Sequence, residues 1–107
     1  MASNLSALDP RLQPYARYIV EYARWRGWSP QVTSTRRSRA EQTALYNRYL
    51  RGESKYPAAA PGHSRHELGL ALDIVTVPES ALAALGAVWR RVGGVWSPSD
   101  AVHFTAP

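Results

Sequence analysis

Two short segments, far apart in the chain, carry the side chains that most constrain how it can fold. The first reads SRHELGLALD and contains His66 and Asp73, and the second reads DAVHF and contains Asp100 and His103. Two imidazoles, one carboxylate ligand and a spare carboxylate match a catalytic zinc site, which needs three protein ligands and an open position. The fold must therefore return the C-terminal segment to the strand that carries Asp73.

The His66-Glu67 pair does not fit the HExxH pattern of zincins, in which a second histidine follows four positions later on a helix. Here that position is Leu70, and the preceding Gly69 argues against a continuing helix. We therefore predict that Glu67 is not a zincin-type base. It remains the reserve candidate for the base, while Asp100 is the first candidate, with capping of its turn as the alternative.

The remaining ligand set is His66, Asp73 and His103. Two neutral imidazoles and one carboxylate leave a bound dication with a net positive charge, which lowers the pKa of a coordinated water toward about 7. The chain has no cysteine, so a metal must bind to nitrogen and oxygen. A purely structural role for each histidine stays open on spacing alone.

Length and charge restrict the partners of this chain. Its 107 residues suit one domain, residues 1–107, with residues 1–8 as a loose N-terminal arm. No apolar run approaches the about 20 residues of a membrane span, and the first residues lack the features of a secretory signal. The net charge of +5 suits an acidic partner, but the arginines are scattered and form no nucleic-acid motif. We predict a monomer that binds neither membrane nor nucleic acid.

Periodicity and capping signals predict an α+β fold, in which a small antiparallel sheet carries the zinc site and about three helices flank it. The predicted helices cover residues 9–27, 38–51 and 78–92. The predicted strands cover residues 29–34, 70–75, 95–96 and 103–105. Residues 52–62 lack any period and form a long loop, which is either a rim over the site or a plain connector.

Apolar spacing predicts which helix faces are buried. On the second helix the predicted inner face comprises Gln42, Leu45, Tyr46 and Tyr49. On the third helix the predicted stripe comprises Leu82, Leu85, Trp89 and Val92.

Three further polar residues are candidates for the site. Arg37, at the start of the second helix, can bind a substrate carboxylate or a developing oxyanion, and simple solvation at the surface is the alternative. Ser64 can donate a hydrogen bond to a ligand or to substrate. His63 is interpreted as an exposed loop histidine near the site.

Three blocks of the sequence resemble one known family. SRHELGLALD resembles the S-x-H-x-x-G-x-A-x-D signature of VanY-like D-alanyl-D-alanine carboxypeptidases and their relatives, which include phage L-alanyl-D-glutamate endopeptidases and the hedgehog-type fold. STRRSRAEQTALY resembles the family's S-G-Y-R-S…Q…L-Y block, and GGVWSPSDAVHF resembles its closing G-G-x-W…D-x-x-H-F. The blocks occur in the family's order, between Ser34 and Phe104.

The resemblance implies Zn²⁺ held by His66, Asp73 and His103, with Asp100 as the catalytic base. By register, Arg37 falls on the family's arginine for substrate or transition state. The resemblance also implies roles in substrate binding or in support of the site for Ser64, Gln42 and Trp96. Thr35-Arg36 stands where the family has a Gly-aromatic pair, so the pocket wall behind the arginine is expected to differ.

The DAVHF segment is more similar to phage endopeptidases than to D-Ala-D-Ala enzymes, which carry an E-x-W-H pattern. The resemblance thus implies a zinc peptidase, similar to a phage endolysin, that cuts peptidoglycan stem peptides between L-Ala and D-Glu. A D-alanyl-D-alanine carboxypeptidase and a non-catalytic phage structural or wall-binding domain are the alternatives. With no signal peptide expected, the protein would be made in the cytoplasm and reach the cell wall through lysis-type release or within a virion.

Overall fold

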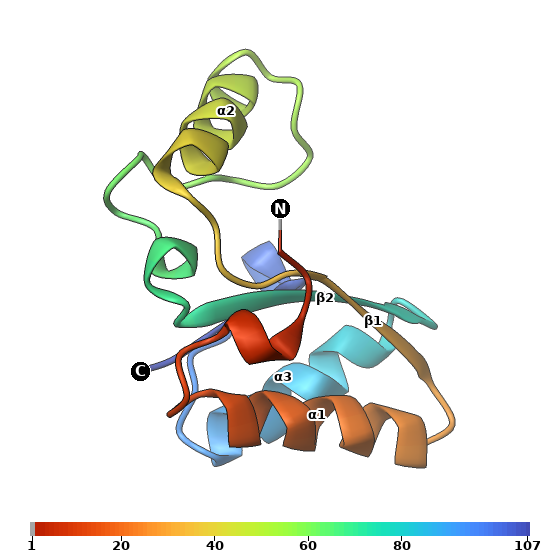
Figure 1. Ribbon diagram of the computed structural model, residues 1–107. Coiled ribbons are helices and arrows are strands. Elements are labelled where there is room, and N and C mark those ends of the chain that lie inside the picture. The colour runs from red at the N-terminus through yellow and green to blue at the C-terminus, as the bar shows by residue number, and fades with distance from the viewer. Residues whose placement is uncertain (1) are drawn as a thin grey trace.

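The computed structural model describes residues 2–107 and confirms the predicted α+β fold (Figure 1). The helices are α1 (Gln13–Trp25), α2 (Arg39–Leu50) and α3 (Ala81–Arg91), and the strands are β1 (Ser29–Ser34), β2 (Ala71–Val77) and β3 (His103–Thr105). The described residues also form three short 3₁₀ helices: η1 (Leu5–Ala7), η2 (Arg65–Leu68) and η3 (Pro98–Asp100).

The sheet is antiparallel, with β2 between β1 and β3. Its register pairs Asp73 with His103 on one side and with Ser34 on the other. The C-terminal strand therefore returns directly beside the strand that carries the aspartate. Helices α1 and α3 lie on one side of the sheet, and α2 stands on the other side (Figure 1).

The core lies between the sheet and the helices α1 and α3. In β2, Leu72 and Ile74 are buried on this side, while Val75 is exposed, so the predicted alternation along the strand is confirmed. The largest buried side chains that meet them come from α1, α3 and β3: Ile19, Leu85, Trp89 and Phe104. The other face of β2 is left for Asp73 and the polar side chains around it.

Helix α2 begins at the predicted capping box. The Ser38 Oγ accepts a hydrogen bond from the Glu41 backbone at 3.1 Å, and the Glu41 carboxylate accepts one from the Ser38 backbone at 3.0 Å. The prediction of a buried inner face was wrong, because Gln42 is the only buried residue of α2. No hydrophobic layer covers this helix, and Leu45 and Tyr49 instead line a cleft.

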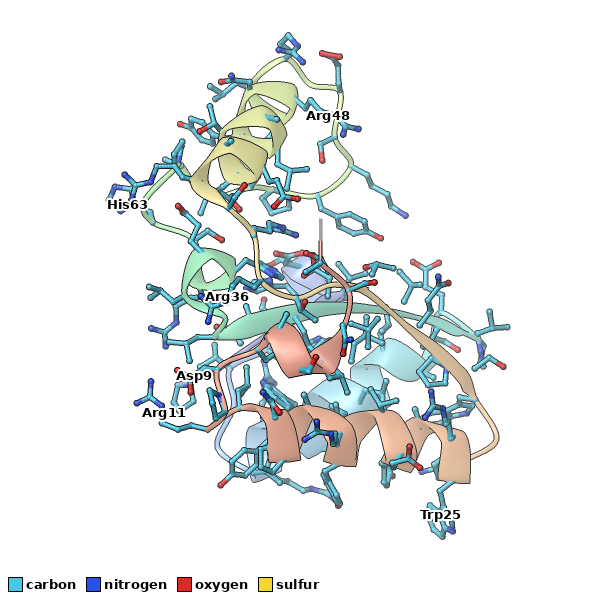
Figure 2. All side chains as sticks on the ribbon, viewed as in Figure 1. Asp9, Arg11, Trp25, Arg36, Arg48 and His63 are labelled. Atoms are coloured by element: carbon cyan, nitrogen blue, oxygen red, sulfur yellow. The ribbon has the colours of Figure 1, made fainter. Side chains whose placement is uncertain are left out.

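The prediction of a loose arm over residues 1–8 was also wrong for the residues that the structure describes; Met1 lies outside them. Leu8 is only 2 % exposed and joins the core, and η1 precedes it. The Asp9 N–H donates to the Gly69 carbonyl at 2.9 Å, which ties this segment to the end of η2. The Asp9 carboxylate accepts hydrogen bonds from the backbone and the side chain of Arg11 (Figure 2). Helix α1 begins at Gln13, four residues later than predicted.

The end of α3 differs from prediction in two respects. Val92 follows the last helical residue and is 38 % exposed, so it does not extend the buried stripe. Val95 forms only a single bridge with Thr105, and no strand is formed at residues 95–96. Gly93, with φ of +97°, turns the chain away from α3, and the next large side chain, Trp96, enters the core.

Replacing Gly86 by alanine is expected to lower the free energy of unfolding by about 1–3 kcal/mol. A Cβ at this position of α3 would lie 2.1 Å from Cδ2 of Trp96, so the helix or the indole would have to move. Urea unfolding measures the effect. The exposed Ala83→Gly variant of the same helix is the control, with a loss of about 1 kcal/mol from helix propensity alone. A Gly86→Ala protein as stable as the parent would contradict the packing described.

Candidate metal centre

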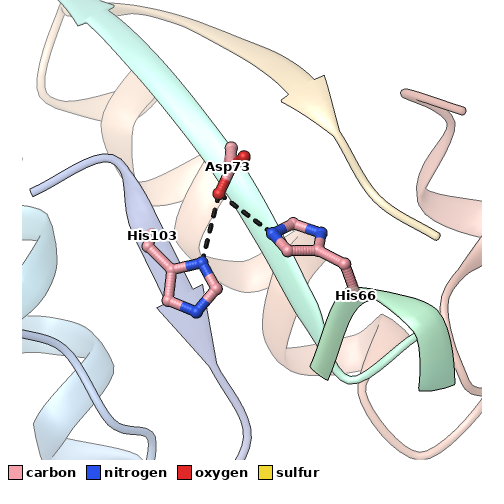
Figure 3. A group of neighbouring side chains, drawn as sticks. All are labelled: His66, Asp73 and His103. Atoms are coloured by element: carbon pink, nitrogen blue, oxygen red, sulfur yellow. Dashed lines mark hydrogen bonds and ion pairs between the residues drawn. The ribbon is translucent and has the colours of Figure 1, made fainter. Parts of the chain in front are cut away.

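His66, Asp73 and His103 point toward one another from η2, β2 and β3 (Figure 3). The Asp73 Oδ1 lies 3.1 Å from the His66 Nε2 and 3.3 Å from the His103 Nδ1. One possible ligand atom from each of the three residues lies within 4.8 Å of the others. The structure thus brings the predicted ligand set together around a single carboxylate oxygen.

The protonation of His66 shows why this group suits a cation. Its Nδ1 lies 2.6 Å from the Thr35 carbonyl oxygen, which can only accept a hydrogen bond. The Nδ1 therefore carries the proton, and in the neutral imidazole the Nε2 presents a lone pair to the Asp73 carboxylate. Two facing lone pairs repel unless a positive charge lies between them. A nitrogen and oxygen donor set of this kind fits Zn²⁺.

Local signals at η2 place His66. The Ser64 Oγ accepts a hydrogen bond from the His66 N–H at 3.2 Å, and Gly69, with φ of +71°, ends the turn. The helix stops there, which confirms that this segment is not a zincin helix. The buried Ser64 also borders the cleft beside His66.

Glu67 faces the loop before η2 rather than the metal ligands. Its carboxylate accepts hydrogen bonds from the Gly62 N–H at 2.8 Å, the Ser64 N–H at 3.4 Å and the Arg39 side chain at 3.3 Å. Burial alone would raise the pKa of Glu67, but these three donors lower it below its usual value. Glu67 therefore holds the loop in place, and its reserve role as the base does not fit the structure.

Arg37 is tied to the metal-ligand carboxylate and is not a solvated surface arginine. Its Nη2 donates to the Asp73 Oδ2 at 2.6 Å, and its side chain is only 12 % exposed. Its Nε donates to the Ser34 Oγ at 3.1 Å, and its Nη1 donates to the Gln42 Oε1 at 3.3 Å. The two oxygens of Asp73 are thus divided between the imidazoles and the guanidinium.

The charge state of Asp73 follows from these contacts. Burial alone would raise the pKa of this carboxyl group. The side chains of His103 and His66 on one carboxylate oxygen, together with the charge of Arg37 on the other, outweigh the burial and hold the pKa well below its usual range. Asp73 is therefore ionised at neutral pH and available as a ligand.

Asp100 lies at the end of η3, half-buried, and borders the same cleft as the three clustered residues. The turn is capped by Ser97, whose Oγ accepts a hydrogen bond from the Ser99 N–H at 3.3 Å. The alternative of Asp100 as the capping residue is therefore not needed. Burial raises the pKa of Asp100, and the charge of His103 offsets this only in part. A carboxyl group of raised pKa beside a cation site suits proton transfer.

The cleft above these residues has a volume of about 520 Å³. Its outer wall is formed by α2 and by residues 54–59 of the loop that follows α2. Gln42 anchors this wall, since its Nε2 donates to the Ala59 carbonyl at 2.8 Å while its Oε1 accepts from Arg37. The structure supports the interpretation of the loop as a rim. His63 lies at the edge of the cleft, with its side chain directed outward (Figure 2).

One predicted site residue lies elsewhere, and several wall residues were not predicted. Trp96 packs in the core against Phe104, and its Nε1 donates to the Ala101 carbonyl at 2.9 Å. It supports the turn that carries Asp100 and does not line the cleft. Among the unpredicted residues, Tyr56 and Val102 line the cleft. The sequence signal that could have identified Tyr56 is its position as an aromatic residue within the long loop.

Comparison with known proteins identifies one matching family and several similar structures. The family model of VanY, D-alanyl-D-alanine carboxypeptidase, matches residues 5–96, so the match ends before Asp100 and His103. No match was found among curated proteins. None of the helices in residues 2–107 is long and apolar enough to cross a membrane.

Three solved structures illustrate the shared fold. VanYB in complex with D-Alanine-D-Alanine is 22% identical with a TM-score of 0.76, covering 92% of this chain and 71% of its own. The LD-carboxypeptidase LdcB is 21% identical with a TM-score of 0.73, covering 94% and 65%. The L-Ala D-Glu endopeptidase ChiX of Serratia marcescens is 24% identical with a TM-score of 0.65, covering 97% and 84%.

Proposed function

The chain belongs to the VanY family of D-alanyl-D-alanine carboxypeptidases, and from that premise we propose that it hydrolyses peptidoglycan stem peptides between L-Ala and D-Glu. It is a zinc metallopeptidase that acts on peptidoglycan. The observation that carries the proposal is the convergence of His66, Asp73 and His103 beside Asp100 in one open cleft. The choice of bond is supported by the DAVHF segment and by the likeness to ChiX.

His66, Asp73 and His103 would hold the zinc ion, which when bound acts as a Lewis acid toward the scissile carbonyl and the attacking water. The Asp100 carboxylate takes a proton from the attacking water and returns it to the leaving amine. Its raised pKa favours the second of these transfers. The water that has lost this proton attacks the carbonyl carbon through its oxygen, and the C–N bond breaks as the amine nitrogen receives the proton from Asp100.

Arg37 has two roles in this proposal. Its guanidinium holds the Asp73 Oδ2, which fixes the other carboxylate oxygen toward the imidazoles. The same group borders the cleft, where it can stabilise the negative charge that develops on the carbonyl oxygen. Gln42 and Ser34 hold the guanidinium in place, and Ser64 borders the cleft as a hydrogen-bond donor to substrate.

A D-alanyl-D-alanine carboxypeptidase is the second candidate, because the family to which the chain belongs is that of the VanY D-alanyl-D-alanine carboxypeptidases. Digestion of purified muropeptides, with products read by mass spectrometry, separates the candidates. New N-terminal D-Glu is the expected result, and released D-Ala would assign the carboxypeptidase activity instead. Products should disappear with a chelator and return with Zn²⁺. A protein that binds wall fragments and releases no product would be the non-catalytic domain.

The manner in which the enzyme reaches its substrate stays a prediction. We propose a monomer that acts on the wall after lysis-type release or as part of a virion, in the manner of a phage endolysin. Sedimentation at micromolar concentration tests the first part, since a monomer should sediment at 11.9 kDa. Addition of the protein to the outside of intact cells and of isolated walls tests whether release by lysis is needed.

A further inference from the structure

A second hollow adjoins the catalytic cleft. It has a volume of about 350 Å³, and Tyr56 and Val102 line both this hollow and the cleft. Its volume lies within the about 300–1,000 Å³ typical of small-molecule sites. The loop that bears Tyr56 follows α2 and lies on the same side of the sheet as this helix (Figure 1). Tyr56 and Val102 therefore lie at the boundary between two neighbouring spaces, each of which can hold part of one extended ligand.

The floor of the second hollow continues the catalytic face of β2. Val75 lines the hollow and is exposed, and it lies on the same face of the strand as Asp73, two residues earlier. Its cross-strand partner Gln31 also lines the hollow. A peptide bound along this face would pass from the metal ligands, beneath Tyr56, to the far end of β2.

Two opposite charges border the second hollow. The Lys55 Nζ lies 4.0 Å from the Glu79 Oε1, and the two side chains are 75% and 76% exposed. An ion pair this exposed contributes only about 0–1 kcal/mol to the free energy of folding. Each of the two groups can therefore leave its partner and bind a ligand at little cost. A ligand with one charge would satisfy one group and repel the other. A ligand end that carries both an amine and a carboxylate matches the pair.

We propose that the second hollow is a substrate subsite for a stem-peptide residue whose side chain ends in a zwitterion, as in a diamino dicarboxylic acid. Lys55 binds the carboxylate of that residue, Glu79 binds its amine, and Tyr56 packs against the aliphatic part between these groups and the scissile bond. The inference rests on the proposed function, because it takes the stem peptide as the ligand. It adds the chemical class of a residue beyond the two that flank the cleaved bond.

The test measures binding without cleavage, so its result does not depend on which bond is cut. The Asp100→Asn protein is titrated by calorimetry with three stem peptides that differ only in the third residue: a diamino dicarboxylic acid, lysine or alanine. We expect the zwitterionic stem to bind about tenfold tighter than the lysine stem, equivalent to about 1.4 kcal/mol. Equal affinities for the three stems, or no binding of any of them, would overturn the proposal.

Single variants in the same background assign the two charges. Lys55→Met should remove the advantage of the zwitterionic stem over the lysine stem, and Glu79→Gln should weaken both of these stems but not the alanine stem. Glu53→Gln is the matched control, since Glu53 is exposed on the same loop, pairs with Arg51 and does not line the hollow. Equal losses for all three stems in Lys55→Met would show a structural effect and overturn the assignment.

The binding experiment and the muropeptide digestion can reject the subsite and the proposed bond independently of each other. Release of D-Ala together with a preference for the zwitterionic stem would reject the proposed bond and keep the subsite. New N-terminal D-Glu with equal affinity for all stems would keep the proposed bond and reject the subsite.

Discussion

Replacing Asp100 by asparagine is expected to lower kcat for stem-peptide hydrolysis by about 10²–10⁴-fold while zinc content stays that of the parent protein. The amide cannot take a proton from the attacking water, and Asp100 is not part of the cluster that would bind the metal. The fold should tolerate the change because Ser97, rather than Asp100, caps the η3 turn. Hydrolysis rates and metal analysis of the same preparation measure the two effects.

Glu67→Gln is the matched control for the base. The Glu67 carboxylate is occupied by donors from Gly62, Ser64 and Arg39, so its loss should loosen the loop and leave proton transfer intact. We expect a change in kcat of less than about tenfold, well below the effect of a lost general base. An inactive Glu67→Gln protein beside an active Asp100→Asn protein would reverse the assignment of the base.

Replacing His66 or His103 by alanine is expected to abolish zinc binding and, with it, hydrolysis. Loss of residues that only support metal ligands already weakens metal binding by about 10–100-fold, and loss of a ligand itself should exceed that. Metal analysis after dialysis measures the loss directly. Thermal unfolding gives a second readout, because a metal present at 100 times its Kd stabilises the folded state by about 2.7 kcal/mol. That metal-dependent gain should vanish in both variants.

The two histidine variants differ in a way that separates metal binding from folding. His66→Ala also removes the buried contact of the Nδ1 with the Thr35 carbonyl, so the metal-free protein should itself lose stability. The His103 side chain is 29% exposed, and its Nδ1 lies 3.3 Å from the Asp73 Oδ1, so its metal-free variant should lose less stability than His66→Ala. His63→Ala is the control at the edge of the cleft and should keep its zinc. Full zinc occupancy in His66→Ala would refute the proposed ligand set.

A continuous set of polar contacts joins the metal ligands to the wall of the cleft. It runs from Asp73 through Arg37 and Gln42 to the Ala59 carbonyl. Gln42 is the only buried residue of α2, so this helix is held by polar contacts rather than by a hydrophobic layer. The wall that meets the substrate and the carboxylate that faces the imidazoles are therefore positioned by the same two side chains.

The features that the sequence determined are those whose signal lies within a few residues. The capping box of Ser38 and Glu41, the alternation along β2 and the stop at Gly69 all depend on neighbours two to four positions apart. Spacing alone left the metal ligands open between a shared site and separate structural roles. The three family blocks, read in order, named the ligand set, the base and the arginine.

Only the tertiary structure decided the contacts between distant segments. Leu8 enters the core next to Asp9, whose N–H is bonded to the distant Gly69, and Glu67 is occupied because the loop before η2 folds back on it. The polar neighbours of α2 and the core position of Trp96 likewise depend on residues far apart in the chain. The energies of such contacts come from burial and hydrogen bonding across the fold, and no local spacing of residues records them.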